Sequence, residues 1–271
     1  MAKKMADKKE KTGAEVNIYT IGGEVRTVSP LPAAFQEAFR PDLIKRAVVA
    51  AQANRRQPYG PMHGAGAMHA VSTWGKGRGV ARVQRLKQGS TAAESANNVG
   101  GRRAHPPRVE RIWRKKINEK ERLKALRSAL HAAASPEIVR ARGHRFGEEI
   151  TLPVVVAGLE EIGKEGWGTK QALELLRSLG LHEDVLRAKN GKRIRVGRGK
   201  MRGRRYRTPR SILVVVRDKR DVAAGFRNLP GVDVVSMREL STEHLAPGGM
   251  PGRLMMMSED AFNDLGKERG K

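Results

Sequence analysis

The feature that most constrains this chain is a long stretch that cannot build a core of its own. Residues 54–118 show no sustained hydrophobic periodicity and contain nine glycines and four prolines. Amphipathic patterns typical of helices lie on either side of this stretch. Because a structureless connection of this length is uncommon inside a compact domain unless it is functional or disordered, we expect a loop that projects from a folded body. We call it the long loop.

The long loop has too little apolar surface to fold alone. Fixing the backbone costs about 1–2 kcal/mol per residue, so ordering the whole loop costs on the order of 100 kcal/mol. We expect it to be mobile in isolation and to become ordered on a surface that supplies charge, hydrogen bonds and stacking. At about 3.3 Å per residue, an out-and-back arm reaches up to about 100 Å. Such an arm suits burial in a large RNA better than docking on a duplex groove.

The charge of the chain supports a polyanionic partner. Lys and Arg number 54 against 28 Asp and Glu, for a formal net charge of +26. Residues 76–116 carry 12 basic and two acidic residues, and residues 189–210 carry 11 basic residues and no acid. By contrast, residues 217–271 are balanced, with nine of each sign. The sequence therefore predicts a nearly neutral globule with two basic segments, for which nucleic acid is the leading partner.

Composition excludes several classes of protein. The chain contains no Cys, which excludes a disulfide-stapled scaffold, a Cys-ligated metal site and a cysteine nucleophile. The first 13 residues are charged and lack an apolar stretch, and no later apolar run approaches the roughly 18 residues that a membrane span needs. We expect a cytoplasmic protein with a charged N-terminal tail at residues 1–13, no membrane contact and no cofactor.

Short β-branched runs alternate with helical patterns outside the basic segments. Residues 152–157 and 211–216 read as strands buried on both faces, which is the pattern of a parallel sheet. Between them, Thr169 is a candidate N-cap for a helix that stops at Gly180. A helix at 221–228, a strand at 232–236 and a last helix opened by Ser258 follow. Residues 16–21 and 25–28 form a hairpin or a strand that enters the same sheet.

Two further helical patterns flank the long loop. One begins at Pro41, and the other has Leu123, Leu126 and Leu130 on one stripe, with a third helix opened by Ser135 and Pro136. The prediction is an α/β fold: one globular domain, residues 14–53 and 119–271, with a mostly parallel sheet and flanking helices. Residues 189–210 would form a second basic loop within this domain.

The residue types of both basic segments suit a phosphate backbone. Gly75, Lys76, Gly77, Arg78 and Gly79 alternate residues without a Cβ and long cations, which lets main-chain N–H groups and side chains approach phosphates closely. Tyr59, Trp74 and Trp113 lie among such cations, where unpaired bases could stack on them or where each could be a small packing anchor.

Several other motifs give weaker predictions. Residues 158–164 match G-x-x-x-x-G-K after a strand, but Glu165 stands where a Mg²⁺-binding hydroxyl is required, and Glu160 and Glu161 would repel phosphate. An NTPase is therefore only the enzyme alternative. The histidines form no metal-ligand pattern, and His144, beside Arg145, is expected to be solvated or to contact RNA. Met255–Met257 reads as filler of the core or of an edge strand, or as a small protein-binding patch.

Five stretches together resemble a known family, the universal large-subunit ribosomal protein four in its archaeal and eukaryotic form. They are residues 40–60 (RPDLIKRAVVAAQANRRQPYG), 74–83 (WGKGRGVARV), 99–107 (VGGRRAHPP), 116–134 (KINEKERLKALRSALHAAA) and 142–146 (RGHRF). The resemblance covers roughly residues 15–255. It is closest to archaeal members, because the long Lys-rich C-terminal extension of eukaryotic members is absent.

This resemblance implies a structural constituent of the large ribosomal subunit without catalytic activity. It implies a globular domain on the outer face of the subunit and a long loop that threads the rRNA to the constriction of the nascent-peptide tunnel. The tip of that loop would lie within residues 60–85, beside a hairpin of another ribosomal protein, the universal protein twenty-two. No metal and no homo-oligomer are expected. The alternatives are an RNA-binding repressor and a DNA-architectural protein.

Two sets of candidate residues follow. The predicted rRNA-binding residues are Arg55, Arg56, Tyr59, Trp74, Lys76, Arg78, Arg82, Arg85, Arg102, Arg103, His105, Arg108, Lys192, Arg193, Arg198, Arg202, Arg204, Arg205 and Arg207. The predicted tunnel-proximal residues are His63, Met68, His69, Trp74, Lys76 and Arg78.

Overall fold

The computed structural model describes residues 15–164, 168–220 and 222–267. The chain divides into two compact units. The body unit comprises Met1–Ala51 and Lys116–Lys271, and the loop unit comprises Gln52–Lys115. The predicted charged tail, residues 1–13, lies outside the described residues, as do Glu165 and the side chains of 162–164 and 267.

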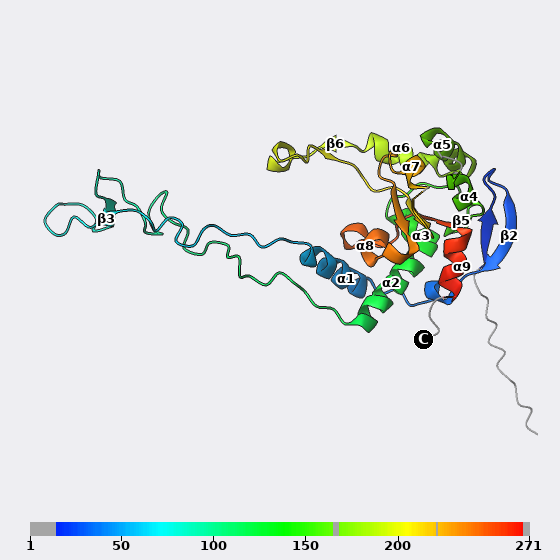
Figure 1. Ribbon diagram of the computed structural model, residues 1–271, viewed down its shortest axis with the longest axis horizontal. Helices are drawn as coiled ribbons and strands as arrows, with labels where there is room; N and C mark the ends of the chain where they lie inside the picture. Colours follow the sequence, from blue (N-terminus) through cyan, green and yellow to red (C-terminus); the bar gives the residue numbers. More distant parts are fainter. Residues whose placement is uncertain (1–14, 165–167, 221, 268–271) are drawn as a thin grey trace, which may run out of the picture. The chain divides into compact units, whose positions relative to one another are not determined.

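A six-stranded sheet forms the centre of the body unit (Figure 1). Its strands, in spatial order, are β2 (Val25–Pro30), β1 (Glu15–Tyr19), β5 (Val154–Val156), β10 (Met255–Ser258), β8 (Leu213–Val216) and β9 (Asp233–Ser236). Only the β1–β2 pair is antiparallel; the other four pairings are parallel. The predicted α/β fold with a mostly parallel sheet is confirmed, and the N-terminal strands form both a hairpin and the entry to the sheet.

The strands β5, β8 and β10 are buried on both faces, which explains their continuous apolar sequences. Val154, Val214 and Met256 face one hydrophobic cluster. Their neighbours, such as Val155 and Met257, face a second cluster on the other side. Because successive side chains of a strand alternate between faces, one run of β-branched and Met residues supplies both cores.

Helices cover both faces of the sheet (Figure 1). On one face lie α4 (Leu159–Lys164), α5 (Thr169–Ser178), α6 (His182–Asn190) and α7 (Ala223–Phe226). On the other lie α1 (Pro41–Asn54), α2 (Glu119–Ala134), α8 (Thr242–Leu245) and α9 (Glu259–Lys267). The helix α3 (Pro136–Ala141) follows α2, and 3-10 turns occur at Ala33–Phe35, Arg198–Met201, Met237–Glu239 and Pro247–Gly249. No described helix is both long and apolar enough to cross a bilayer.

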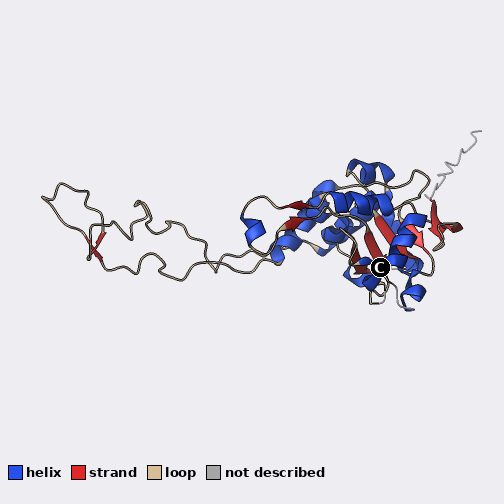
Figure 2. Cartoon of the chain, turned by 90° about the horizontal axis from the view of Figure 1, so that it is seen from above, coloured by secondary structure: helices blue, strands red, loops and turns tan. Residues whose placement is uncertain are grey.

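The loop unit consists almost entirely of irregular backbone (Figure 2). Beyond the end of α1 and an isolated bridge between Arg85 and Ala92, its regular structure is one small antiparallel pair, β3 (Val71–Ser72) with β4 (Arg85–Leu86). The second basic loop in the body unit has a similar pair, β6 (Arg193–Ile194) with β7 (Tyr206–Arg207). Both pairs are too short to have been read from periodicity.

Two local features differ from what the sequence predicted. Gly168, not Thr169, is the N-cap of α5, and its N–H donates to Gln171 Oε1 at 2.8 Å. The helix α6 was not predicted. Met255–Met257 lies in a central strand with all three side chains buried, which confirms the expectation of core filler and excludes the edge-strand alternative. The last helix opens as expected, because Ser258 Oγ accepts a hydrogen bond from Ala261 N at 3.2 Å.

Candidate nucleic-acid interface

A buried carboxylate organises the base of the second basic loop. Asp184, near the start of α6, is fully buried. Arg187 donates to its Oδ1 from Nε at 2.8 Å. Ser211, two positions before the start of β8, donates to its Oδ2 at 2.8 Å. Arg187 also donates from Nη2 to the Arg210 carbonyl at 2.8 Å. One acid thus joins the two ends of the loop, residues 187 and 211.

His144 is the third side chain that binds Asp184. Its Nδ1 lies 3.0 Å from Asp184 Oδ2, and because a carboxylate only accepts, Nδ1 is the donor. Burial, aided by the charges of Arg187 and Arg142, lowers the pKa of His144 despite this hydrogen bond. Its ring is therefore neutral at pH 7. This corrects the sequence-based expectation that His144 is solvated or contacts RNA.

The charge of Asp184 persists in this buried position. Burial alone would raise the pKa of its carboxyl group, but hydrogen bonds from His144, Arg187 and Ser211 outweigh that effect. The pKa of Asp184 is therefore held well below its ordinary value. The nearby Arg187 supplies the compensating positive charge, which makes the arrangement a paired buried ion rather than an isolated one.

A second ion pair, between a buried arginine and a half-buried aspartate, holds the same end of the loop. Arg253, just before β10, is 1% exposed and donates from Nη2 to Asp233 Oδ2 at 2.7 Å. It also donates from Nε to the Ser211 carbonyl at 2.9 Å. Arg210 donates to the other oxygen of Asp233 at 2.6 Å. The returning end of the second basic loop is therefore held from both sides, while the loop itself stays exposed.

The two limbs of the loop unit run side by side (Figure 2). Lys115 N donates to Asn54 Oδ1 at 2.9 Å. A Cβ on Gly60 would lie 2.8 Å from the Pro107 carbonyl oxygen and 3.0 Å from Val109 N. A real Cβ does not approach backbone that closely, so a side chain at position 60 would push the limbs apart. Gly60 therefore permits close contact between the outgoing and returning segments.

Internal hydrogen bonds also shape the far part of the loop unit. Arg85 donates from Nη1 to the Ser90 carbonyl at 2.6 Å, and Leu86 N donates to the Thr91 carbonyl at 3.0 Å. Lys87 N donates to the Ala70 carbonyl at 3.2 Å. Gly75, Gly77 and Gly79 have φ values of +75°, +83° and +65°. Side-chain-bearing residues rarely adopt this region, so the glycines permit the path that displays Lys76 and Arg78.

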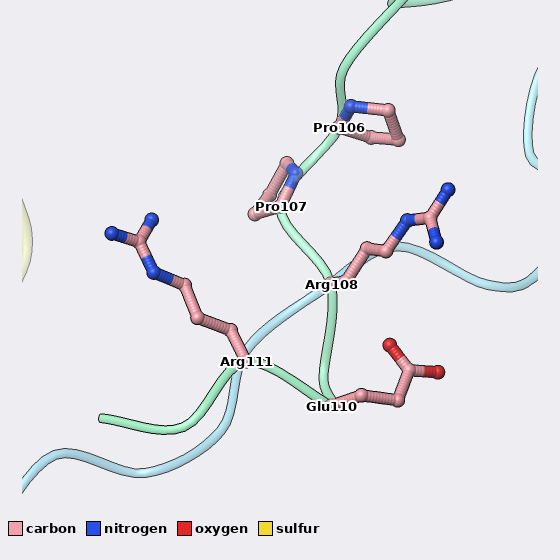
Figure 3. Close-up of a pocket in the computed structure, with 5 residues that line it drawn as sticks. All are labelled: Pro106, Pro107, Arg108, Glu110 and Arg111. Atoms are coloured by element: carbon pink, nitrogen blue, oxygen red, sulfur yellow. The ribbon is translucent and has the colours of Figure 1, made fainter. Parts of the chain in front are cut away.

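A pocket lies on the returning limb of the loop unit (Figure 3). It is lined by Pro106, Pro107, Arg108, Glu110 and Arg111. In this view the guanidinium groups of Arg108 and Arg111 reach to opposite sides of the two prolines, and the Glu110 carboxylate lies on the Arg108 side. Two cations against one acid give this wall a positive balance, which suits an anionic ligand.

The predicted interface residues lie in these two loops, and nearly all of them face solvent. Of the nineteen predicted rRNA-binding residues, every one is exposed except Arg85, which is half-buried. His63, Met68 and His69 are also exposed. Tyr59 is 73% exposed and Trp74 is 37% exposed. The structure brings Trp74, Arg78 and Arg85 together, and it joins Lys192, Arg205 and Tyr206 in the same way.

Sequence reasoning missed the residues that hold the base of the second basic loop. Asp184, Arg187, Ser211, Asp233 and Arg253 carried no motif. The i, i+3 spacing of Asp184 and Arg187 on one helix was the only available signal, and it could not show that Ser211 completes the cluster.

Within the G-x-x-x-x-G-K segment, a carboxylate lies where a phosphate would have to bind. Glu160, in the first turn of α4, accepts a hydrogen bond from Ser258 Oγ at 2.8 Å and another from Arg217 N. A phosphate at this helix start would meet that negative charge, which agrees with the rejection of an ATP-binding loop. Among the described residues, no group of His, Asp and Glu has the arrangement of a metal site.

Together, the fold and the loops define a class: α/β proteins in which a well-packed domain carries long, cation-rich loops. A family model described as "Ribosomal protein L4/L1 family" matches residues 29–268. The chain therefore belongs to the ribosomal protein L4/L1 family, whose role is structural rather than catalytic. This confirms the resemblance found in the sequence.

Individual relatives agree with the family match. The large ribosomal subunit protein uL4 of Methanocaldococcus jannaschii is 50% identical over 253 residues, which cover 93% of this chain and 98% of that protein. The protein of the same name from Archaeoglobus fulgidus is 48% identical, with the same coverage. That of Methanothrix thermoacetophila is 51% identical over 236 residues, or 87% of this chain and 92% of that protein.

Proposed function

We propose that the chain binds large-subunit rRNA through its long loop, residues 54–118, and its second basic loop, residues 189–210. Membership of the family makes the chain a structural constituent of the large ribosomal subunit. The observation that carries the proposal is the location of the charge. The excess is +10 over residues 76–116 and +11 over residues 189–210, and nearly all of these cations are exposed. When cations neutralise phosphates, the counterions held by the RNA are released. This release supplies most of the free energy of binding that does not depend on sequence.

The anchoring of the second basic loop supports this role. Asp184 and Asp233 hold residues 187, 210 and 211 at the base of the loop. The ordering cost at these positions is met by the body unit, so it does not have to be met when RNA binds. The loop can then present Arg198, Arg202 and Arg204 from a fixed base.

We further propose that the tip of the long loop helps to form the constriction of the nascent-peptide tunnel, next to the universal protein twenty-two. The proposal rests on the family resemblance of residues 74–83 and 99–107. The exposure of the candidate tip residues supports it, since His63, Met68, His69, Trp74, Lys76 and Arg78 are all open to a neighbouring surface. A map of the parent particle at side-chain resolution tests this placement directly.

Charge-matched variants of the full chain test rRNA binding. Lys76, Arg78 and Arg82 are changed together to Gln in one variant. A control variant carries the same change at three exposed cations of the body unit, Lys170, Arg177 and Arg227. We expect the loop variant to bind deproteinised large-subunit rRNA more weakly and with a smaller salt dependence, by about 0.7–0.9 in slope for each phosphate that is no longer neutralised. If both variants lost the same affinity for rRNA, the binding would be unspecific attraction between charges, and the proposal would be contradicted.

Competition separates the remaining alternatives. At one physiological salt concentration, large-subunit rRNA should displace the chain from duplex DNA, because shape and single-stranded contacts add to the shared attraction of phosphate. Equal affinity for the two would favour a DNA-architectural protein. Failure of the chain to join the large subunit in low-salt sucrose gradients would contradict the proposal.

A further inference from the structure

Three aromatic rings in the basic loops each lie against two cations. The guanidinium carbons of Arg111 and Arg56 lie 4.4 and 5.3 Å from the ring centroid of Trp113. Those of Arg85 and Arg78 lie 5.1 and 5.7 Å from the ring of Trp74. At Tyr206 the distances are 4.5 Å to Lys192 Nζ and 5.6 Å to the Arg205 guanidinium carbon. The pattern recurs at three separate positions.

In each cluster, one cation comes from the opposite limb of the loop. Arg56 lies on the outgoing limb of the loop unit, whereas Trp113 and Arg111 lie on the returning limb. Arg85 is in β4, and Trp74 follows β3, its antiparallel partner. Lys192 directly precedes β6, and Tyr206 is in β7. The ring therefore holds together two charged side chains that the chain path alone would leave independent.

Holding two cations beside one ring has an electrostatic consequence. The ring attracts each cation through its negative face, but the two positive charges repel each other. An anion that contacts both cations relieves this repulsion. Its binding also costs less ordering of side chains, because the ring already holds the cations in place. A base that stacked on a ring face already covered by a cation would have to displace that cation.

The hydrogen-bond inventory points to the same ligand. Within the described part of the chain, two buried side-chain nitrogen or oxygen atoms lack a hydrogen-bond partner, Trp113 Nε1 and Arg85 Nε. Both belong to these clusters, and both are donors. Buried donors without partners are rare in native structures, and a phosphate oxygen is an acceptor.

We propose that Trp113, Trp74 and Tyr206 act as cation holders: each presents two positive groups to one stretch of RNA sugar–phosphate backbone, rather than offering its face to a base. The inference rests on the proposed binding of rRNA and specifies what each site recognises. The ligand is the phosphate group, bound by two cations; because Trp113 Nε1 and Arg85 Nε are buried, either one donates to it only after the surrounding side chains shift. Sequence readout at these three positions is therefore weak.

The test measures the affinity of the full chain for large-subunit rRNA across a range of salt concentrations. Trp113→Leu removes the ring, Trp113→Phe keeps a ring face, and Tyr59→Leu removes an exposed ring for which no cation contact is seen among the described residues. We expect Trp113→Leu to weaken binding by about two- to five-fold and to flatten the plot of log affinity against log salt. Trp113→Phe should keep the wild-type slope. Tyr59→Leu should keep it as well even where it weakens binding, because it releases no cation held by a ring. Trp74→Leu and Tyr206→Leu should repeat the result at the other two sites.

A double-mutant comparison separates the two roles of the ring. If Trp113 acts through its cations, Trp113→Leu has no further effect on the salt slope once Arg56 and Arg111 are Gln. A loss of affinity by Trp113→Leu that leaves the slope unchanged, or that persists in full in the Gln background, would show base stacking and overturn the inference. Wild-type chain that does not bind rRNA at all would instead contradict the proposed function itself.

Discussion

The Ser211 hydroxyl donates to the Asp184 carboxylate at 2.8 Å, although 27 residues separate them in the chain. This contact closes the base of the second basic loop. Arg145 N donates to the other carboxylate oxygen at 3.0 Å, so backbone from a third segment also meets here. A single buried acid therefore fixes where a strongly basic loop leaves α6 and where it returns to the sheet at β8.

Removing the charge of Asp184 should destabilise the whole body unit. In Asp184→Asn, the amide nitrogen faces donors that need an acceptor, and Arg187 loses its counter-charge. We expect a loss of about 3–5 kcal/mol in the free energy of unfolding. The control is Glu183→Gln, at the exposed neighbouring position, which should change stability by less than about 0.5 kcal/mol. Urea unfolding measures both, and equal midpoints for the two variants would refute the anchoring role of Asp184.

Stability should fall as the pH is lowered from 7.5. The pKa values of His144 and Asp184 are both lower in the folded chain than their ordinary values of 6.5 and 3.8. The unfolded chain therefore binds more protons, and acid favours unfolding. The His144 contribution is complete above pH 6.5 and is lost as the pH falls below it; that of Asp184 is lost below about pH 3.8.

The decline between pH 7 and 5 has a second source. His244 is half-buried, and its burial together with the Arg253 charge lowers its pKa as well. Thermal unfolding of the wild type and of His144→Gln, at steps of half a pH unit, measures how much of the loss of stability is due to each histidine. We expect the variant to lose less stability over this range while keeping the part due to His244. A wild-type midpoint that is flat or rises on acidification would contradict the neutral state of both rings.

The position of β10 gives a prediction about the core. Met256 is fully buried between β5 and β8, so Met256→Ala leaves a cavity that the close-packed strands cannot fill. We expect a loss of about 2–5 kcal/mol. Met250→Ala, at a side chain that is 67% exposed, is the matched control and should be nearly neutral. Similar urea midpoints for the two would argue for an edge position of the Met run.

The parts of the fold that could be predicted are those set by local pattern. Residues 154–156 and 213–216 are continuous, Val-rich apolar runs, and short runs of this kind between turn signals indicate buried strands. The long loop was evident from its glycines, prolines and charge, because composition alone shows that it cannot bury a core. For the candidate interface, composition was sufficient to identify exposed cations.

Strand order and side-chain clusters could not be predicted from the sequence, because they depend on pairings between distant segments. Nothing in Met255–Met257 indicates that this strand lies between β5 and β8, since a buried edge strand and a buried central strand have the same composition. His144 looked like an RNA contact because it adjoins Arg145. Its burial depends on Asp184, which lies 40 residues away. The contact between Arg56 and Trp113 could not be predicted either, because it depends on how the two limbs of the loop are aligned with each other.

Close contact between the limbs of the loop unit makes a final prediction. In Gly60→Ala, the new Cβ would meet the backbone of Pro107 and Val109 at 2.8–3.0 Å, and backbone at this distance must move. We expect the free variant to be cut by trypsin within residues 52–115 faster than the wild type, with an unchanged urea midpoint for the body unit. The control is Gly22→Ala, whose Cβ would meet only Thr20 Oγ1 at 3.7 Å, and it should be cut at the wild-type rate. Bound rRNA should slow cleavage of every form, since it buries the same backbone. Equal cleavage rates for the free Gly60→Ala and Gly22→Ala variants would mean that the limbs are not in contact before RNA binds.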